Sequence, residues 1–280
     1  MTREPLSRQS ISDLTRRINE SFRVPMSRAT VWRILHEETI KPWQHESWLY
    51  PRDPHFAEKA GVILELYAGR WDGKSLGPKD YVLSSDEKTS IQARKRCHAE
   101  TPPRSKQPRR IEAEYKRGGA LQYLAVWDVH RGLIMGRCEA KTGIVPFGRL
   151  LDQVLERSPY REAERLFCVV DNGSSHRGVA SILRAKKRDP RIILVHTPVH
   201  ASWLNQVEIY FSIIQRKVLT PNNFVDLAEV RSRLALYEEL ANRTPRPFAW
   251  KFTRQKMAEW LQRASPHFST AKTARAEGQS

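Results

Sequence analysis

Residues 165–172 read RLFCVVDN, an apolar run that ends in an aspartate and an asparagine. The stretch from Leu166 to Val170 carries no charge, which is typical of a strand buried on both faces of a sheet. Asp171 follows directly. The sequence therefore predicts a carboxylate at the carboxyl end of a central strand.

Two further acidic residues accompany apolar stretches. Asp86 ends the short predicted strand YVLSSD at 81–86, and Glu208 lies inside the amphipathic segment ASWLNQVEIYF at 201–211. Three carboxylates brought together repel one another unless cations neutralise them. Mg²⁺, which takes oxygen ligands, is the expected cation. Two such ions would form a clamp for displacement at phosphorus.

The intervening segments predict an α/β fold. Strand 81–86 is followed by a hairpin over 121–140, helices over 142–157, 174–188, 202–219 and 226–243, and strands over 165–171 and 191–198. Three strands, then helix, strand, helix, strand and helix is the order of the ribonuclease-H-like fold, a mixed sheet flanked by helices. Right-handed crossovers would place Asp86 and Asp171 on neighbouring strands, and the next helix would bring Glu208 beside them.

Each acid also has a simpler interpretation. Asp86 could be a turn or helix-cap aspartate, and Glu87 beside it is an alternative ligand. Because Asn172 and a glycine follow Asp171, that residue could form an Asx turn while still projecting its carboxylate. Glu208 could be an ordinary surface glutamate on an amphipathic helix.

The N-terminal region predicts two short helices within residues 7–37, joined by a turn. Helix, turn and helix is the homeodomain-like pattern of many DNA-binding segments. Arg28, Thr30 and Arg33, near the start of the second helix, are then candidates for DNA contact. An ordinary helical hairpin is the alternative.

The net charge of +17 favours a polyanionic partner, because lysine or arginine bound to a phosphate releases a counterion. A solvated basic surface or an anionic membrane surface are the alternatives. Residues 94–118 hold nine lysines and arginines and three prolines, which predicts a mobile basic insertion without regular structure. Residues 90–96, which overlap the start of this insertion, could form a strand paired with 81–86. The DNA-binding candidates here are Arg94, Lys95, Arg96, Arg109, Arg110, Lys116 and Arg117.

The sequence does not indicate a membrane span, a zinc site or a disulfide framework. The sequence has no run of about eighteen apolar residues, so we expect no membrane span. Its three cysteines form no CxxC pair, which indicates neither a zinc site nor a disulfide framework. We expect a cytoplasmic protein associated with the nucleoid.

Three ordered motifs carry a family resemblance: SSDEKTSIQARKR at 84–96, VVDNGSSHRG at 169–178 and HTPVHASWLNQVEIYFSIIQRKVL at 196–219. Together they resemble DDE transposases of bacterial insertion sequences in the Tc/mariner superfamily. The spacing from Asp171 to Glu208 agrees with the family's narrow range. The resemblance covers most of residues 7–262.

The resemblance implies that Asp86, Asp171 and Glu208 are the catalytic and metal-binding triad, with Asn172 and Asn205 at flanking family positions. His176 follows Asp171 in the same loop or the first helical turn after it, and is a further supporting candidate on that ground. His176 could contact phosphate or make a structural hydrogen bond. The implied reaction is polynucleotidyl transfer, which excises and inserts a DNA element with two Mg²⁺ ions, for which Mn²⁺ can substitute. The implied partners are terminal inverted repeats, target DNA at a TA dinucleotide, and a second copy of the chain in a paired-end complex.

Two alternatives remain at this level: a truncated or domesticated, non-catalytic DNA-binding relative, and a structure-specific nuclease of the same fold. The expected organisation is a DNA-binding segment at 1–40, a linker and helix at 41–79, the catalytic domain at 80–225, and C-terminal helices with a frayed tail at 226–280. Family members begin with a longer helical region, so we expect segment 1–40 to be incomplete.

Overall fold

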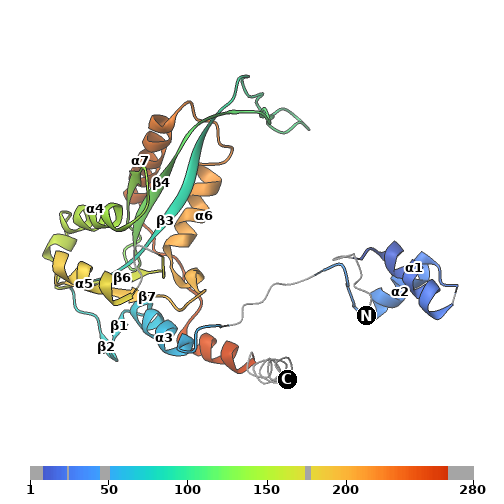
Figure 1. Ribbon diagram of the computed structural model, residues 1–280, viewed down its shortest axis with the longest axis horizontal. Coiled ribbons are helices and arrows are strands. Elements are labelled where there is room, and N and C mark those ends of the chain that lie inside the picture. The colour runs from blue at the N-terminus through green and yellow to red at the C-terminus, as the bar shows by residue number, and fades with distance from the viewer. Residues whose placement is uncertain (1–8, 24, 45–50, 174–177, 264–280) are drawn as a thin grey trace. The chain divides into compact units, whose positions relative to one another are not determined.

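The computed structural model describes residues 9–23, 25–44, 51–173 and 178–263 (Figure 1). Its contacts divide the chain into two units, Met1–Tyr50 and Pro51–Ser280. The first unit contains α1 (Ile11–Phe22) and α2 (Arg28–Glu37). The second contains α3 (Phe56–Tyr67), β1 (Arg70–Trp71), β2 (Lys74–Ser75), β3 (Asp80–Lys95), β4 (Lys116–Asp128), β5 (Ile134–Glu139), α4 (Ile144–Leu155), β6 (Arg165–Val170), α5 (Gly178–Arg188), β7 (Ile192–His196), α6 (Val207–Lys217) and α7 (Leu227–Arg243). None of the helices in these ranges has the length and apolar character needed to cross a membrane.

Local hydrogen bonds define both helices of the first unit. The Ser10 hydroxyl accepts from the backbone N–H of Asp13, whose carboxylate accepts the Ser10 N–H, so α1 begins with a capping box. The Ser27 hydroxyl accepts the N–H of Thr30 at the start of α2. Between the helices, the Asn19 amide exchanges two hydrogen bonds with the backbone of Met26. The predicted helix pair is confirmed, while its use as a helix-turn-helix stays a prediction.

The second unit is built on a five-stranded sheet with the order β5-β4-β3-β6-β7. Strands β3, β4 and β5 pair antiparallel, whereas β3, β6 and β7 pair in parallel. The parallel pairs need crossovers, which α4 and α5 supply. The predicted mixed sheet is therefore confirmed, and β3, which contains Asp86, is the neighbour of β6, which Asp171 follows.

Strand β3 is longer than the sequence suggested. Residues 81–86 and 90–96 were expected to be two paired strands, but they belong to one strand, Asp80–Lys95, whose partner is β4. The register shifts between Lys88 and Ile91, and Ser90 there has a φ of 57°. A β-bulge absorbs the extra residues and lets the strand continue.

Beyond this bulge, β3 and β4 extend together as a two-stranded arm (Figure 1). The expectation of irregular structure over 94–118 is thus wrong at both ends, which lie in these strands. At the tip, isolated pairings join Thr101 to Arg110 and Arg104 to Gln107. The Glu112 carboxylate accepts backbone N–H groups from residues 97 and 98 at 2.9 Å. The basic segment therefore has defined turns of its own.

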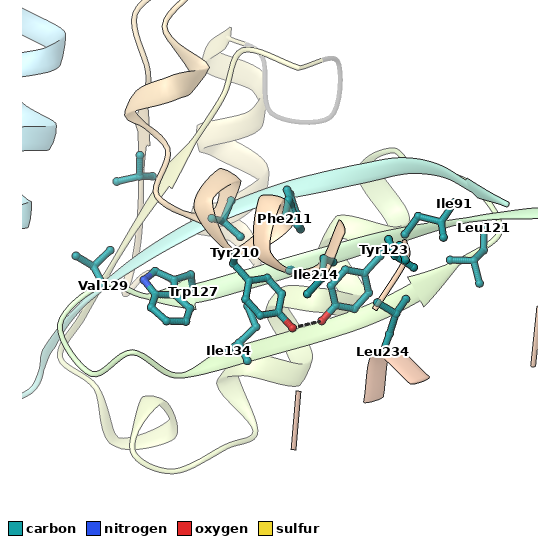
Figure 2. Packing of buried hydrophobic residues seen from close by; sticks show 14 of the residues in the cluster. Ile91, Leu121, Tyr123, Trp127, Val129, Ile134, Tyr210, Phe211, Ile214 and Leu234 are labelled. Carbon is teal, nitrogen blue, oxygen red and sulfur yellow. Dashed lines mark hydrogen bonds between the residues drawn. The ribbon is translucent and has the colours of Figure 1, made fainter. Parts of the chain in front are cut away.

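The sheet lies between two helical layers. On β6, Phe167 and Val169 face α6 and α7, while Leu166, Cys168 and Val170 face α4 and α5. Both sets are almost fully buried, which confirms the prediction of a central strand. Figure 2 shows the α6 side, where side chains of β4 meet Tyr210, Phe211 and Ile214.

Helix α3 fixes the segment that leads into α6. The Tyr67 hydroxyl donates to the carbonyl of Leu204 at 2.7 Å. The buried carboxylate of Asp53 accepts the backbone N–H of Val199 at 2.9 Å and the Lys59 ammonium at 2.8 Å. These bonds hold the segment between β7 and α6, next to the end of β6.

Candidate active site

The sheet register brings two of the three candidate carboxylates together. Strands β3 and β6 pair in parallel up to Ser85 and Val170. Asp86 and Asp171 each come one residue later and therefore lie side by side. Asp171 follows the end of β6, whereas Asp86 lies inside β3, opposite Ala125, so the prediction that Asp86 ends its strand is wrong. Asp86 is buried, with 7% of its surface exposed, and Asp171 is half-buried.

A tight turn shapes the end of β6. The Asp171 carboxylate accepts the backbone N–H of Gly173 at 2.8 Å, which is the predicted Asx turn. A Cβ atom at position 173 would lie 2.8 Å from that carboxylate oxygen, so a larger residue would displace it. The Asn172 amide donates to the carbonyl of Thr197 at 2.7 Å and ties β6 to the end of β7. The turn thus fixes Asp171 without burying it.

A buried network places Glu208, in the first turn of α6, beside β3. The Ser84 hydroxyl donates to the Asn205 side-chain oxygen and accepts the backbone N–H of Val207 at 2.8 Å. The Asn205 amide donates to the Ser85 carbonyl at 2.8 Å and lies 3.5 Å from an oxygen of Asp86. Ser84 and Asn205 are both fully buried. Together they join the strand of Asp86 to the helix of Glu208.

The carboxylates oppose one another's ionisation. Burial raises the pKa of Asp86 to about 8, and the charges of Asp171 and Glu208 add to this effect, against a hydrogen bond from the Glu87 N–H. Burial also raises the pKa of Glu208, with a further increase from Asp171 and a decrease from Lys88. The three groups therefore form one electrostatic site.

This site fits a hard divalent cation by its chemistry. All three candidate ligands are carboxylates, and a cation would relieve their repulsion. As the side chains stand, no three His, Cys, Asp or Glu residues in the described ranges are close enough to enclose a metal ion. The register and the Asn205 network fix the backbones of the three residues on adjoining elements, and their side chains can rotate towards a bound cation. An open pocket of about 420 Å³ borders Asp171 and the segment 197–202.

The Asn205 network yields a first prediction. Asn205→Ala should lower the free energy of unfolding by about 1–3 kcal/mol, because Ser84 and the Ser85 carbonyl lose buried partners. It should also lower the DNA cleavage rate per folded molecule, because Glu208 loses its fixed position. Asn242→Ala is the matched control, since Asn242 makes two comparable bonds to Ile134 on β5, the edge strand that is separated from β3 by β4.

Denaturant unfolding and cleavage assays would be run on both variants. The control should lose stability but keep its cleavage rate per folded molecule. Equal cleavage by the two folded variants would show that Asn205 does not position the site.

The DNA-binding candidates are distributed over separate parts of the chain. Arg28 and Arg33 are exposed on α2, whereas the Thr30 hydroxyl lies 2.9 Å from that of Ser27 in the helix cap. These three residues belong to the first unit, and their contact with DNA stays a prediction. His176 lies outside the described residues.

On the arm, the basic residues fall into two groups. Arg96 donates to the carbonyls of Glu112 and Asn222, and Arg109 pairs with Glu100. Arg94 lies over the Tyr115 ring, 4.7 Å from its centre. The exposed group comprises Lys95, Arg110, Lys116 and Arg117. The role of both groups in DNA binding stays a prediction.

Two residues at the site were missed by the sequence reasoning, Ser84 and Lys88. Both lie two residues from Asp86 on β3, where the register is unbroken and alternation places all three on the α6 face. That alternation was visible in the sequence and could have identified them.

Comparison with known proteins gives consistent results. A family model described as DDE superfamily endonuclease matches residues 81–231, more than half of the chain. No curated protein gives a significant match. Among solved structures, a Mos1 mariner paired-end complex with Mn aligns at a TM-score of 0.52 and 15% identity, covering 86% of this chain and 74% of that one.

A paired-end complex of the same transposase with Mg aligns at a TM-score of 0.51 and 14% identity, covering 86% and 74% of the two chains. The Mos1 strand transfer complex aligns at a TM-score of 0.51 and 15% identity, covering 85% of this chain and 73% of that one. At these identities the likeness concerns the fold, and it confirms the predicted ribonuclease-H-like architecture.

Proposed function

The chain belongs to the DDE superfamily endonucleases, and from this membership we propose that it is a transposase. Its reaction would be polynucleotidyl transfer: the protein cuts DNA strands at the ends of an element and joins those ends to new DNA. The prediction of a DDE-type enzyme from the three motifs is confirmed at the level of the family.

The convergence of Asp86, Asp171 and Glu208 carries this proposal. Asp86 lies inside β3, Asp171 follows the end of the adjacent strand β6, and Glu208 comes from the first turn of a helix bonded to β3. Such a rigid, partly open group of carboxylates suits catalysis at phosphorus, where metal positioning dominates.

We expect these three residues to hold two Mg²⁺ ions, for which Mn²⁺ would substitute. When bound, the ions supply charge neutralisation and orientation for the attacking and leaving oxygens. The residues of the chain keep the ligands in place: Asn205 fixes the α6 end, and the Gly173 N–H holds one oxygen of Asp171. The complexes of Mos1 with Mn and Mg support this choice of cations by analogy.

DNA is the proposed partner. The net charge of +17 would offset phosphate charge along a bound duplex. We expect the chain to bind terminal inverted repeats, to insert at TA dinucleotides and to act as a homodimer that pairs two ends. The paired-end complexes of Mos1 support this arrangement by analogy. Such a protein would work at the nucleoid, in the cytoplasm.

Three DNA substrates test the proposal against its alternatives. In Mg²⁺, the protein should cut a duplex carrying the repeats that flank its coding sequence, and should leave an RNA–DNA hybrid and a four-way junction intact. Gel analysis of end-labelled strands would measure this. Preferential cutting of the hybrid or junction would indicate a structure-specific nuclease, and tight binding without cutting would indicate a non-catalytic DNA-binding protein.

A further inference from the structure

Lys88 occupies an unusual position beside the triad. It lies two residues after Asp86 on β3, and the pairs Asp86–Ala125 and Lys88–Tyr123 show an unbroken register between them. Both side chains therefore leave the strand on the α6 face. The ammonium is close enough to Glu208 to hold down the pKa of that carboxyl. Within the ranges that the structure describes, the Lys88 ammonium forms no hydrogen bond and no ion pair.

Lys88 also lines a polar groove that leads away from the triad. The groove has a volume of about 400 Å³, within the usual range for ligand clefts, and lies between β3 and the segment that follows α6. Side chains that can donate hydrogen bonds line it: Lys88, Ser90, Gln92, Gln215, Arg94 and Arg96.

The groove has a rigid wall. Asn222 donates to the Gln92 carbonyl at 2.6 Å and accepts the Arg94 N–H at 3.1 Å, so its side chain spans the second register shift of β3. The Gln215 amide donates to the Thr220 hydroxyl at 3.0 Å and ties the same segment to α6. The walls are thus set by the protein itself.

The two arginines of the groove are already engaged. The Arg96 guanidinium donates to two backbone carbonyls, and the Arg94 guanidinium stacks on Tyr115 and donates to Gln92. Both serve to hold the base of the arm together. Lys88 is the cation of the groove that has no such bond among the described residues, and it is the one nearest the triad.

We propose that Lys88 binds a backbone phosphate of the DNA strand, adjacent to the phosphate that the triad cleaves. An ammonium half-buried at the mouth of a polar groove can form a charge-assisted bond with a phosphate oxygen. The strand would then run from the triad along the groove towards the basic arm. This inference rests on the proposed function, because it assumes a DNA strand at the triad.

The first test measures binding in EDTA, where no cleavage occurs. A duplex carrying the flanking repeats would be titrated with wild-type protein, Lys88→Gln and Lys88→Arg over a range of salt concentrations. Lys88→Gln should bind roughly tenfold more weakly and reduce the slope of log K against log salt by about one. Lys88→Arg should behave like the wild type. Lys74→Gln, an exposed lysine on β2, is the control and should change neither quantity.

The second test locates the phosphate. Single uncharged methylphosphonates would be placed in turn at the phosphates on either side of the cut. One position should weaken wild-type binding and have no further effect on Lys88→Gln. Equal effects at every position in both proteins, or an unchanged salt slope, would overturn the inference.

The inference would also be overturned if Lys88→Gln changed only the Mg²⁺ concentration needed for cleavage. Lys88 would then serve only as a counter-charge to Glu208. Failure of the wild-type protein to bind or cut any repeat duplex would instead reject the proposed function itself.

Discussion

Asp171→Asn should abolish metal-dependent DNA cleavage while leaving DNA binding intact. Asp171 follows β6 and adjoins Asp86, and its carboxylate is held by a single turn rather than buried. Asparagine preserves the size and the turn but removes the charge that a divalent cation needs. We expect the single-turnover rate to fall by about 10³-fold or more, which corresponds to at least about 4 kcal/mol of transition-state stabilisation.

The same preparations would be tested for binding to the repeat duplex. Binding should be unchanged or slightly stronger, because one negative charge near phosphate is lost. Asp152→Asn is a suitable control, since Asp152 lies on α4 and pairs with Arg188 away from the triad. If Asp171→Asn cut DNA at the wild-type rate, the assignment of the triad would be wrong.

Asp86→Asn should stabilise the metal-free protein at neutral and alkaline pH. The pKa of Asp86 is raised from 3.8 to about 8, chiefly by burial. Below about pH 4 the carboxyl is protonated in both folded and unfolded states and has no effect. As pH rises from about 4 to 8 the unfolded state loses its proton first, so the folded state loses stability, on the order of 6 kcal/mol over the whole window.

Denaturant unfolding at several pH values would measure the difference between wild type and Asp86→Asn. That difference should grow across this window, and Mg²⁺ should reduce it by stabilising only the wild type. If the free energy of unfolding of the two proteins changed with pH in the same way, burial and neighbouring charges would not raise the pKa of Asp86.

Strands and their order could be predicted where the local sequence pattern allows one interpretation. The uninterrupted apolar run at 166–170 predicted a strand covered on both faces, and both core clusters confirm it. The order of elements predicted that the strands of Asp86 and Asp171 are neighbours, which the register confirms. Here local preference and tertiary packing favour the same structure.

The extent of β3 and the partners of individual side chains could not be predicted, because they depend on residues distant in the sequence. The bulge around Ser90 interrupts the alternation of inward and outward side chains along β3. The sequence there is equally compatible with a turn between two strands, so the continuation of β3 was not predicted. Arg96 looked like a free DNA contact, yet it donates to carbonyls of Glu112 and Asn222. Asn205 was noted only by resemblance, since nothing local reveals that its amide reaches residues of β3.

Metal-dependent cleavage at the ends of the element is most directly tested by mapping the cuts themselves. Wild-type protein would be incubated with a DNA fragment carrying the flanking repeats, in Mg²⁺ or in EDTA, and the product ends would be sequenced. Cuts at the repeat ends in Mg²⁺ and none in EDTA are the predicted result. Cuts that persist in EDTA, or binding to the repeats with no cuts in Mg²⁺, would contradict it.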